Sequence, residues 1–398
     1  MRRAAVVSPV RTPVGAFGGA LRGVSVETLG SIVTKAVLER TGLDPARIED
    51  VCFAQSYANS ETPCVGRWIA LEAGLPIEVP GLQTDRRCGG GLQAIVTAAM
   101  MVQTGACDVV LAGGVESMSN VEFYTTDVRW GRRSGTIQLY DRLDRGRERS
   151  QPVERFGYIS GMIETAEHLA RDYDISRQDA DAFAVESHRR AATAWDEGHF
   201  ADEVVPVPVP QKRGDPVLFT RDEGIRPDSA METLAKLRPI MKDGTVTAGN
   251  AAQQNDAAAA CLIVAEDKLA KLGLEPIAFL VGWSAVGCDP ARMGIGPVGA
   301  TAKLFEKTGL GFDDMGLIEL NEAFAAQVLA VLKAWNWHDR SKLNVNGSGI
   351  SLGHPIGATG ARMMTTLTRE MRRRGVRYGL ETMCIGGGQG MAAIFERV

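Results

Sequence analysis

The chain has 398 residues, a length that predicts two domains or one large fused pair with ample buried core. Its formal net charge is −4, and its densest basic run, residues 129–149, is interleaved with acidic residues and glycines. This charge pattern does not support a general nucleic-acid surface, although it allows a local site for an anionic cofactor.

Cysteine usage and the N-terminus bear on cellular location. The seven cysteines are odd in number and form no Cys-x-x-Cys pair, which predicts reduced thiols in a cytosol and argues against a disulfide framework or a zinc site. The first apolar run stops at Pro9, as in a first strand and not a signal peptide, and no apolar stretch approaches membrane-spanning length. We therefore expect a cytoplasmic protein with no nucleic-acid, membrane or metal partner.

Apolar runs that suit strands alternate with helical segments in the first part of the chain. In chain order these are a strand at 4–7, a helix at 26–40, a strand at 50–54, a helix after Cys88 and a strand at 109–112. Such alternation predicts a layered α/β fold.

Residues from about 119 to 245 interrupt this alternation. They contain a stretch rich in Arg, Gly and Asp, a helix pair near 163–173 and 178–197, and a proline-punctuated segment at 204–210. We interpret them as an inserted loop domain that lies over the core, where loops commonly carry binding function.

Strand-like sequence returns at 257–265, and residues 271–276 look like a linker into a second half. The expected domains are therefore 1–268, which includes the insertion, and 273–398.

The second half shows signs of repeating the first. The tripeptide Thr-Gly-Leu at 41–43 recurs at 308–310, an offset of 267 residues. The same offset carries Cys88 to the neighbour of His354, and carries Cys384 back to the end of the strand-like run near residue 117. Both halves would then present a strand end and a helix start to one central site.

Cys88 is the first candidate for chemistry. Three glycines and the apolar-rich run 92–101 follow it, which places a thiol at the beginning of a helix, where unpaired N–H groups and the dipole favour a thiolate. The glycines leave the sulfur uncovered, so a thioester carbonyl could approach and find backbone donors for its oxyanion. The alternative is a buried cysteine at a tight turn.

Three segments of the second half carry further reactive side chains. Asn321 opens Asn-Glu-Ala-Phe after a strand, where it could orient a water or a carbonyl, or simply cap a helix. His354 stands in a glycine-rich run, residues 344–360, where it is either catalytic or a satisfied structural histidine. Cys384 ends a strand and precedes a second glycine cradle that begins at Gly386.

Taken together, these segments closely resemble the thiolase family, and the resemblance runs essentially end to end. Its motifs here are Cys-Gly-Gly-Gly-Leu-Gln-Ala, Asn-Glu-Ala-Phe, Gly-His-Pro-Ile-Gly-Ala-Thr-Gly and Cys-Ile-Gly-Gly-Gly-Gln-Gly. Asn-Gly-Ser-Gly-Ile-Ser-Leu-Gly-His-Pro is most similar to bacterial biosynthetic β-ketothiolases. The resemblance implies the thiolase fold: two similar βαβαβαββ-type halves in an α/β/α/β/α arrangement, with an inserted loop domain.

The resemblance also implies an acetyl-CoA C-acyltransferase that condenses or cleaves 3-ketoacyl-CoA reversibly. Cys88 would take the acyl group as a thioester, and His354 would accept the thiol proton. His354 and a water held by Asn321 would form one oxyanion site, and the N–H groups of Cys88 and Gly386 a second. Cys384 would remove the α-proton of acetyl-CoA. A Claisen condensation needs both an electrophile and a carbanion equivalent, so one cysteine cannot serve both steps.

Coenzyme A and acyl-CoA are the implied substrates, with no permanently bound cofactor. Arg226 and Thr233 resemble nucleotide-contacting residues, although either could be an ordinary surface residue. Met162 and Phe324 are expected beside the acyl group. Ala252 stands where many relatives have a serine that touches the pantetheine arm. The Gly-Met-Ile sequence around Met162 replaces a common His-Met-Gly beside the acyl pocket, which leaves acyl chain length open.

Two other functions are compatible with this fold. A decarboxylating ketoacyl synthase or a hydroxymethylglutaryl-CoA-type synthase is disfavoured by Cys384, because a ketoacyl synthase is expected to use a second histidine there. A non-catalytic acyl-CoA or sterol carrier would not need all three reactive residues. Since relatives are dimers or tetramers, we expect a homodimer or homotetramer.

Overall fold

The computed structural model of the protein describes residues 2–398. The N-terminal half supplies six strands to the main sheet, and its two longest inner strands, β5 and β10, are buried at every position, which explains their unbroken apolar sequences. The six are β1 (Ala4–Arg11), β2 (Gly15–Ala16), β3 (Asp50–Ala54), β4 (Gly81–Thr84), β5 (Val109–Ser117) and β10 (Asn255–Ala265).

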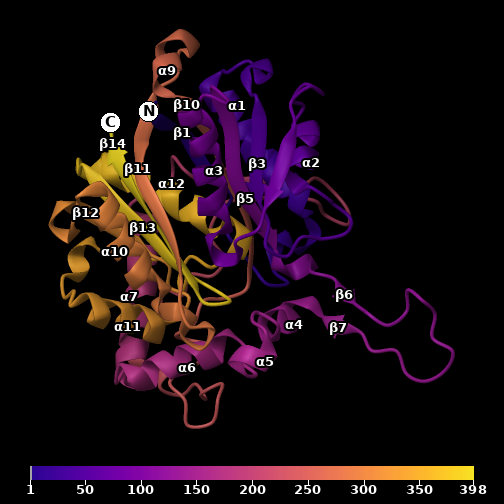
Figure 1. Cartoon of the computed structure of the whole chain (residues 1–398), viewed down its shortest axis with the longest axis vertical. Coiled ribbons are helices and arrows are strands. Elements are labelled where there is room, and N and C mark those ends of the chain that lie inside the picture. The colour runs from indigo at the N-terminus through magenta and orange to yellow at the C-terminus, as the bar shows by residue number, and fades with distance from the viewer. Residues whose placement is uncertain (1) are drawn as a thin grey trace.

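The C-terminal half adds four strands, and the two halves share one continuous sheet (Figure 1). The four are β11 (Pro276–Gly287), β12 (Met315–Leu320), β13 (Tyr378–Ile385) and β14 (Gln389–Arg397). The sheet order is β12-β13-β14-β11-β1-β10-β5-β3-β4, and β2 pairs with β10. Antiparallel pairing of β1 with β11 joins the halves, a contact that the sequence did not indicate.

Helices form three layers that alternate with the N-terminal and C-terminal parts of this sheet. The inner layer consists of α3 (Gly90–Thr104) and α12 (Ile356–Arg374), whose apolar side chains share one core with strands of both halves. The outer layers have separate cores. One contains α1 (Val26–Thr41), α2 (Val65–Glu72) and α9 (Glu266–Leu272), and the other α10 (Gly296–Thr308) and α11 (Ala325–Trp335). The α/β/α/β/α order predicted from the resemblance is confirmed.

The internal repeat is visible at the predicted offset of 267 residues. Helix α1 ends at Thr41 before a left-handed Gly42, and α10 ends at Thr308 before a left-handed Gly309. The same offset superimposes β3 on β12, α3 on α12 and β5 on β13. The halves differ at β4, because residues 348–351, which correspond to it, form turns instead of a strand.

The two inner helices meet backbone to backbone at their N-terminal ends. A Cβ added to Gly91 would lie 2.6 Å from the backbone nitrogen of Ala361, and one added to Gly360 would collide with the backbone of Leu92. Glycine is therefore required on both sides of the contact. Since Cys88 precedes α3 and His354 precedes α12, this contact brings the two residues toward the same end of the sheet.

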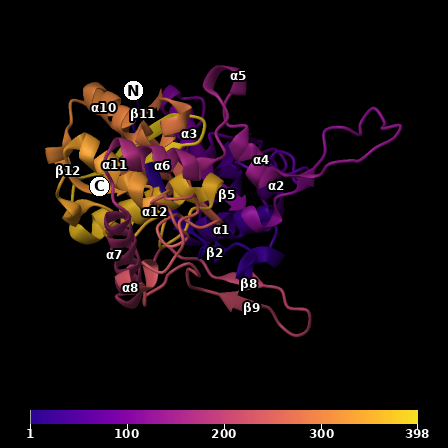
Figure 2. The same cartoon turned by 90° about the horizontal axis from the view of Figure 1, so that it is seen from below.

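The insertion covers that end of the sheet (Figures 1 and 2). It starts with a two-stranded hairpin whose loop projects far from the body of the protein (Figure 1). The inserted elements are β6 (Phe123–Tyr124), β7 (Tyr140–Asp141), α4 (Arg142–Glu148), α5 (Val153–Phe156), α6 (Met162–Asp172), α7 (Arg177–Asp196), β8 (Val207–Val209), β9 (Val217–Phe219) and α8 (Met231–Leu234). Within residues 2–398, no helix has both the length and the apolar character needed to cross a bilayer.

Candidate active site

Cys88 lies in a short 3-10 turn, η3 (Arg87–Gly89), directly before α3. Arg87 has a φ of 46°, in the left-handed region that residues other than glycine rarely adopt, so the turn that presents the sulfur is strained. The thiol is half-buried, which leaves one side open to a substrate.

Burial raises the pKa of the Cys88 thiol above its ordinary value of 9, although the backbone N–H groups of Gly386 and of Cys88 itself act in the opposite direction. Both N–H groups lower the pKa because they donate hydrogen bonds to the charged sulfur. Desolvation outweighs the donors at the helix terminus, so these contributions favour the thiol over the thiolate expected from the sequence.

His354 is held by contacts on its backbone and on its ring. Its backbone N–H donates to Oδ1 of Asn255 at 2.9 Å, and its Nδ1 lies 2.7 Å from the hydroxyl of Thr359. That hydroxyl donates its single proton to the Pro355 carbonyl at 2.9 Å. Thr359 must therefore accept from Nδ1–H of the histidine, which leaves Nε2 as the basic nitrogen.

The His354 ring is neutral. Burial and, next, the positive charge of Arg362 lower its pKa to about 3. A neutral imidazole can accept a proton over the whole physiological range. The structural role that a solitary histidine often has does not account for this arrangement, because Nε2 is left without a strong partner.

Asn321 lies at the end of β12, beside the imidazole. Its Nδ2 is 3.5 Å from Nδ1 and 3.4 Å from Nε2 of His354, so it is not aimed at either ring nitrogen. Its Oδ1 is buried and accepts no hydrogen bond from residues 2–398. Asn321 does not cap α11, whose N-cap residue is Phe324. A free buried acceptor next to an imidazole suits the binding of a water.

Cys384 is fully buried on β13 and packs with Phe324 and Met162. Burial first, and then the neighbouring sulfurs of Cys88 and Cys288, raise the pKa of Cys384 well above its ordinary value. Because the charge of Cys88 contributes to the pKa of Cys384, the two sulfurs interact electrostatically.

One pocket of about 630 Å³ unites most of the residues selected from the sequence. Cys88, His354, Met162, Phe324, Arg226 and Ala252 all line it. Cys384, Asn321 and Gly386 do not line it, and Cys384 belongs to the buried cluster that contains Phe324 and packs against Met162. Thr233 does not line it. Its hydroxyl donates to the Ala230 carbonyl at 2.7 Å at the start of α8, on the protein surface.

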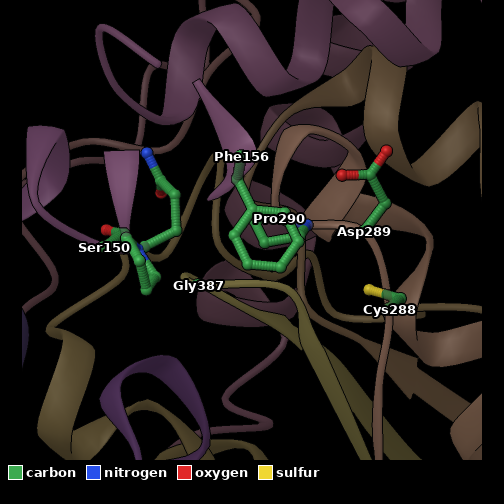
Figure 3. A pocket seen from close by; sticks show the side chains of 8 residues that line it. Ser150, Phe156, Cys288, Asp289, Pro290 and Gly387 are labelled. Atoms are coloured by element: carbon green, nitrogen blue, oxygen red, sulfur yellow. The ribbon is translucent and has the colours of Figure 1, made fainter. Parts of the chain in front are cut away.

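A second cavity of about 550 Å³ lies on the other side of the glycine turn that follows Gly386. Figure 3 shows Cys288 and Asp289 on one side of Phe156, and Ser150 on the other. None of Cys88, His354 and Cys384 lines this cavity. The described part of the chain, residues 2–398, also contains no cluster of His, Cys, Asp or Glu suited to a metal ion.

Glu116 is a buried residue beneath the site that sequence reasoning missed. Its carboxylate accepts hydrogen bonds from the backbone N–H groups of Ser56 at 3.1 Å, Tyr57 at 3.2 Å and Gly357 at 2.9 Å. Burial raises its pKa to about 7 in spite of these donors. Glu116 thereby ties β5 to the first turn of α12. A single acid at the end of the apolar β5 sequence was its only signal.

Comparisons with known proteins agree with this geometry. Residues 4–267 match the family model described as thiolase, N-terminal domain, and residues 274–397 match thiolase, C-terminal domain. An acetyl-CoA acetyltransferase of Chromobacterium violaceum is 45% identical over 99% of both chains. The β-ketothiolase BktB of Cupriavidus necator is 45% identical over 100% of both.

Solved structures show the same fold. The Bacillus anthracis acetyl-CoA acetyltransferase is 41% identical and superimposes with a TM-score of 0.96 over 100% of this chain and 99% of the other. Human mitochondrial 3-ketoacyl-CoA thiolase in complex with CoA is 40% identical, with a TM-score of 0.93 over 100% of this chain and 98% of the other. The chain belongs to the thiolase family.

Proposed function

We propose that Cys88, His354 and Cys384 act together on one CoA thioester in the 630 Å³ pocket. Membership of the thiolase family makes the protein an acyltransferase that forms or cleaves 3-ketoacyl-CoA. The observation that carries our assignment of residues is that Cys88 and His354 line one pocket, where Nε2 of His354 is the basic nitrogen and the backbone N–H groups of Cys88 and Gly386 are directed at the sulfur.

In the first half-reaction, Nε2 of His354 accepts the proton of Cys88 as the sulfur attacks the carbonyl carbon. Negative charge develops on the carbonyl oxygen, and the N–H groups of Cys88 and Gly386 are placed to stabilise it. The CoA thiolate then leaves and takes the proton held by His354, so the products are an acyl group on Cys88 and free CoA.

In the second half-reaction, Cys384 exchanges a proton with the α-carbon of acetyl-CoA. Its raised pKa makes the thiolate, once formed, a stronger base than an exposed cysteine. The carbanion equivalent then attacks the acyl group on Cys88. Its thioester oxygen would accept a hydrogen bond from a water held by Oδ1 of Asn321, and Nε2 of His354 would donate a second one once it has taken up a proton.

The mouth of the pocket would hold coenzyme A. Arg226 and Ala252 line this outer part, and one structural relative is a complex with CoA. Ala252 offers no hydroxyl, so polar contacts with the pantetheine arm would come from other pocket groups, such as the side chains of Gln253 and Gln254. Thr233 has no contact with the pocket and is left out of the proposed CoA site.

We also propose a cytoplasmic location and self-association. All seven cysteines are free thiols, in keeping with a reducing compartment.

The projecting hairpin exposes 94% of Trp130, 65% of Leu139 and 64% of Phe123, and exposed apolar patches of this kind mark interfaces. Sedimentation velocity should give a dimer or tetramer that Trp130→Ser weakens. A single-chain species at micromolar concentration would refute self-association.

Replacing each cysteine should separate the two half-reactions. Cys88→Ala should abolish acyl-enzyme formation from acetyl-CoA, measured by intact-protein mass spectrometry. Cys384→Ala should still become acylated but lose deuterium exchange at the acetyl α-carbon, because only the proton-transfer group is missing. Normal exchange by Cys384→Ala would disprove its role. Failure of the wild-type protein to thiolyse any 3-ketoacyl-CoA would instead favour a carrier.

Thr359 should matter through the histidine tautomer. Thr359→Val keeps the side-chain shape but removes the acceptor for Nδ1–H, so acylation should slow by roughly 10- to 100-fold, the effect of losing one buried hydrogen bond to a reacting group. KM for acetyl-CoA should stay constant, and Thr359→Ser should restore the rate. If serine and valine variants lose activity equally, Thr359 has only a packing role.

A further inference from the structure

Two arginines meet beside the nucleophile, where an acyl chain attached to Cys88 would lie. A cavity of about 40 Å³ next to the sulfur is lined by Ser56, Tyr57, Arg87, Cys88, Arg147, Met162, Ile356 and Gly386. Cys88, Arg147, Met162 and Ile356 also line the large pocket, so the two spaces meet at the nucleophile. The mechanism proposed above uses neither arginine.

Arg87 brings a positive charge close to the sulfur without a carboxylate partner. Within residues 2–398, its side chain makes one hydrogen bond, from Nη1 to the Gly146 carbonyl at 3.2 Å, and no ion pair. A guanidinium has five N–H donors, so most of them remain available. Its charge acts on Cys88, whose pKa is raised chiefly by burial and lowered in part by Arg87.

Arg147 reaches the same corner from α4. Its one ion pair is a 3.3 Å contact with Asp144, whose side chain is 72% exposed and faces solvent. Tyr57 lies between the two arginines: burial raises its pKa, whereas Arg147 and then Arg87 lower it. The other acid lining the large pocket near Arg147 is Glu148, which accepts a hydrogen bond from Tyr158 at 3.0 Å.

The path to this corner is apolar and unobstructed. Met162 and Ile356 provide its walls. At Gly161, an added Cβ would meet nothing nearer than the Cβ of Arg147 at 3.8 Å, so the glycine leaves space beside both. A ligand that fits would have a short methylene chain and an anionic end, because Arg87 has no carboxylate partner among residues 2–398 and the one ion pair of Arg147 is with the exposed Asp144, so both guanidinium groups have donors left for a carboxylate.

We propose that the acyl group carried by Cys88 ends in a carboxylate bound by Arg87 and Arg147. This inference rests on the proposed thiolase function and specifies its substrate class: 3-ketoacyl-CoA with a terminal carboxylate. Because Arg87 is adjacent to Cys88 in the chain, the carboxylate lies only a few bonds from the thioester. A four-carbon acyl group on Cys88, the succinyl group that cleavage of 3-oxoadipyl-CoA would leave there, is of this kind.

The reaction balances with the residues already described. The sulfur of Cys88 attacks C3 of 3-oxoadipyl-CoA, and the C2–C3 bond breaks. C2 takes the proton of Cys384 and leaves as the methyl group of acetyl-CoA. The thiol of free CoA then gives its proton to the Cys384 thiolate, and its sulfur attacks the succinyl group on Cys88. This gives succinyl-CoA, and the departing Cys88 thiolate recovers its proton from His354. The carboxylate takes no part in bond making and serves only recognition.

The test compares two substrates of equal chain length. Thiolysis of 3-oxoadipyl-CoA by the wild-type protein should exceed that of neutral 3-oxohexanoyl-CoA by at least about 10-fold in kcat/KM, since the neutral chain offers neither guanidinium group a carboxylate. Arg87→Met and Arg147→Met should each lower this ratio by roughly 10- to 100-fold. Arg149→Met, an exposed neighbour in the same segment, is the matched control and should leave the ratio unchanged.

Acylation of the wild-type protein gives a test that does not depend on the variants. Succinyl-CoA and butanoyl-CoA, offered together, should label Cys88 mainly with succinyl, as measured by peptide mass spectrometry. Preference for butanoyl, or variants that slow both thiolysis reactions equally, would overturn the carboxylate site while leaving the thiolase function intact. No labelling by either ester, with no thiolysis of either ketoacyl chain, would overturn the proposed function itself.

Discussion

The close approach of α3 and α12 is the contact on which the rest of the site depends. Gly91 and Gly360 let the two helix backbones touch, so no side chain separates their first turns. Cys88 stands before one helix and His354 before the other, and both therefore open into the same pocket. Glu116 strengthens this arrangement because it accepts the N–H of Gly357 in α12 and two N–H groups from the segment after β3.

Burial then decides the charge state of every reacting group. It raises the pKa of both cysteines and lowers that of His354 to about 3, so the groups are neutral before substrate arrives. In the proposed mechanism, charge appears only as the thioester reacts, next to the N–H groups of Cys88 and Gly386 and a water held by Asn321. Arg87 and Arg147 are charged, unlike the reacting groups. We therefore assign them to recognition of an anionic chain end and not to bond making.

The sequence predicted the elements whose apolar patterns are regular, including β3, α7 and the repeat that relates α1 to α10. It also identified Cys88, His354, Asn321 and Cys384, because glycine-flanked reactive side chains stand out in a chain. It could not predict contacts made only by folding. Thr359 sets the imidazole tautomer from within α12, and Arg147 reaches Cys88 from an inserted helix. The sequence favoured a thiolate at Cys88 because donors at a helix start can be predicted from a sequence. Desolvation of the sulfur, which favours the thiol, cannot.

The central claim is that one pocket holds an acyl group on Cys88 with its oxygen between two backbone donors. A crystal structure of Cys384→Ala after reaction with acetyl-CoA tests this most directly, since that variant should stop at the acyl-enzyme. The account predicts an acetyl group on the sulfur of Cys88, with its oxygen about 2.7–3.1 Å from the nitrogens of Cys88 and Gly386. An acetyl group on another cysteine, or an oxygen directed away from both nitrogens, would contradict it.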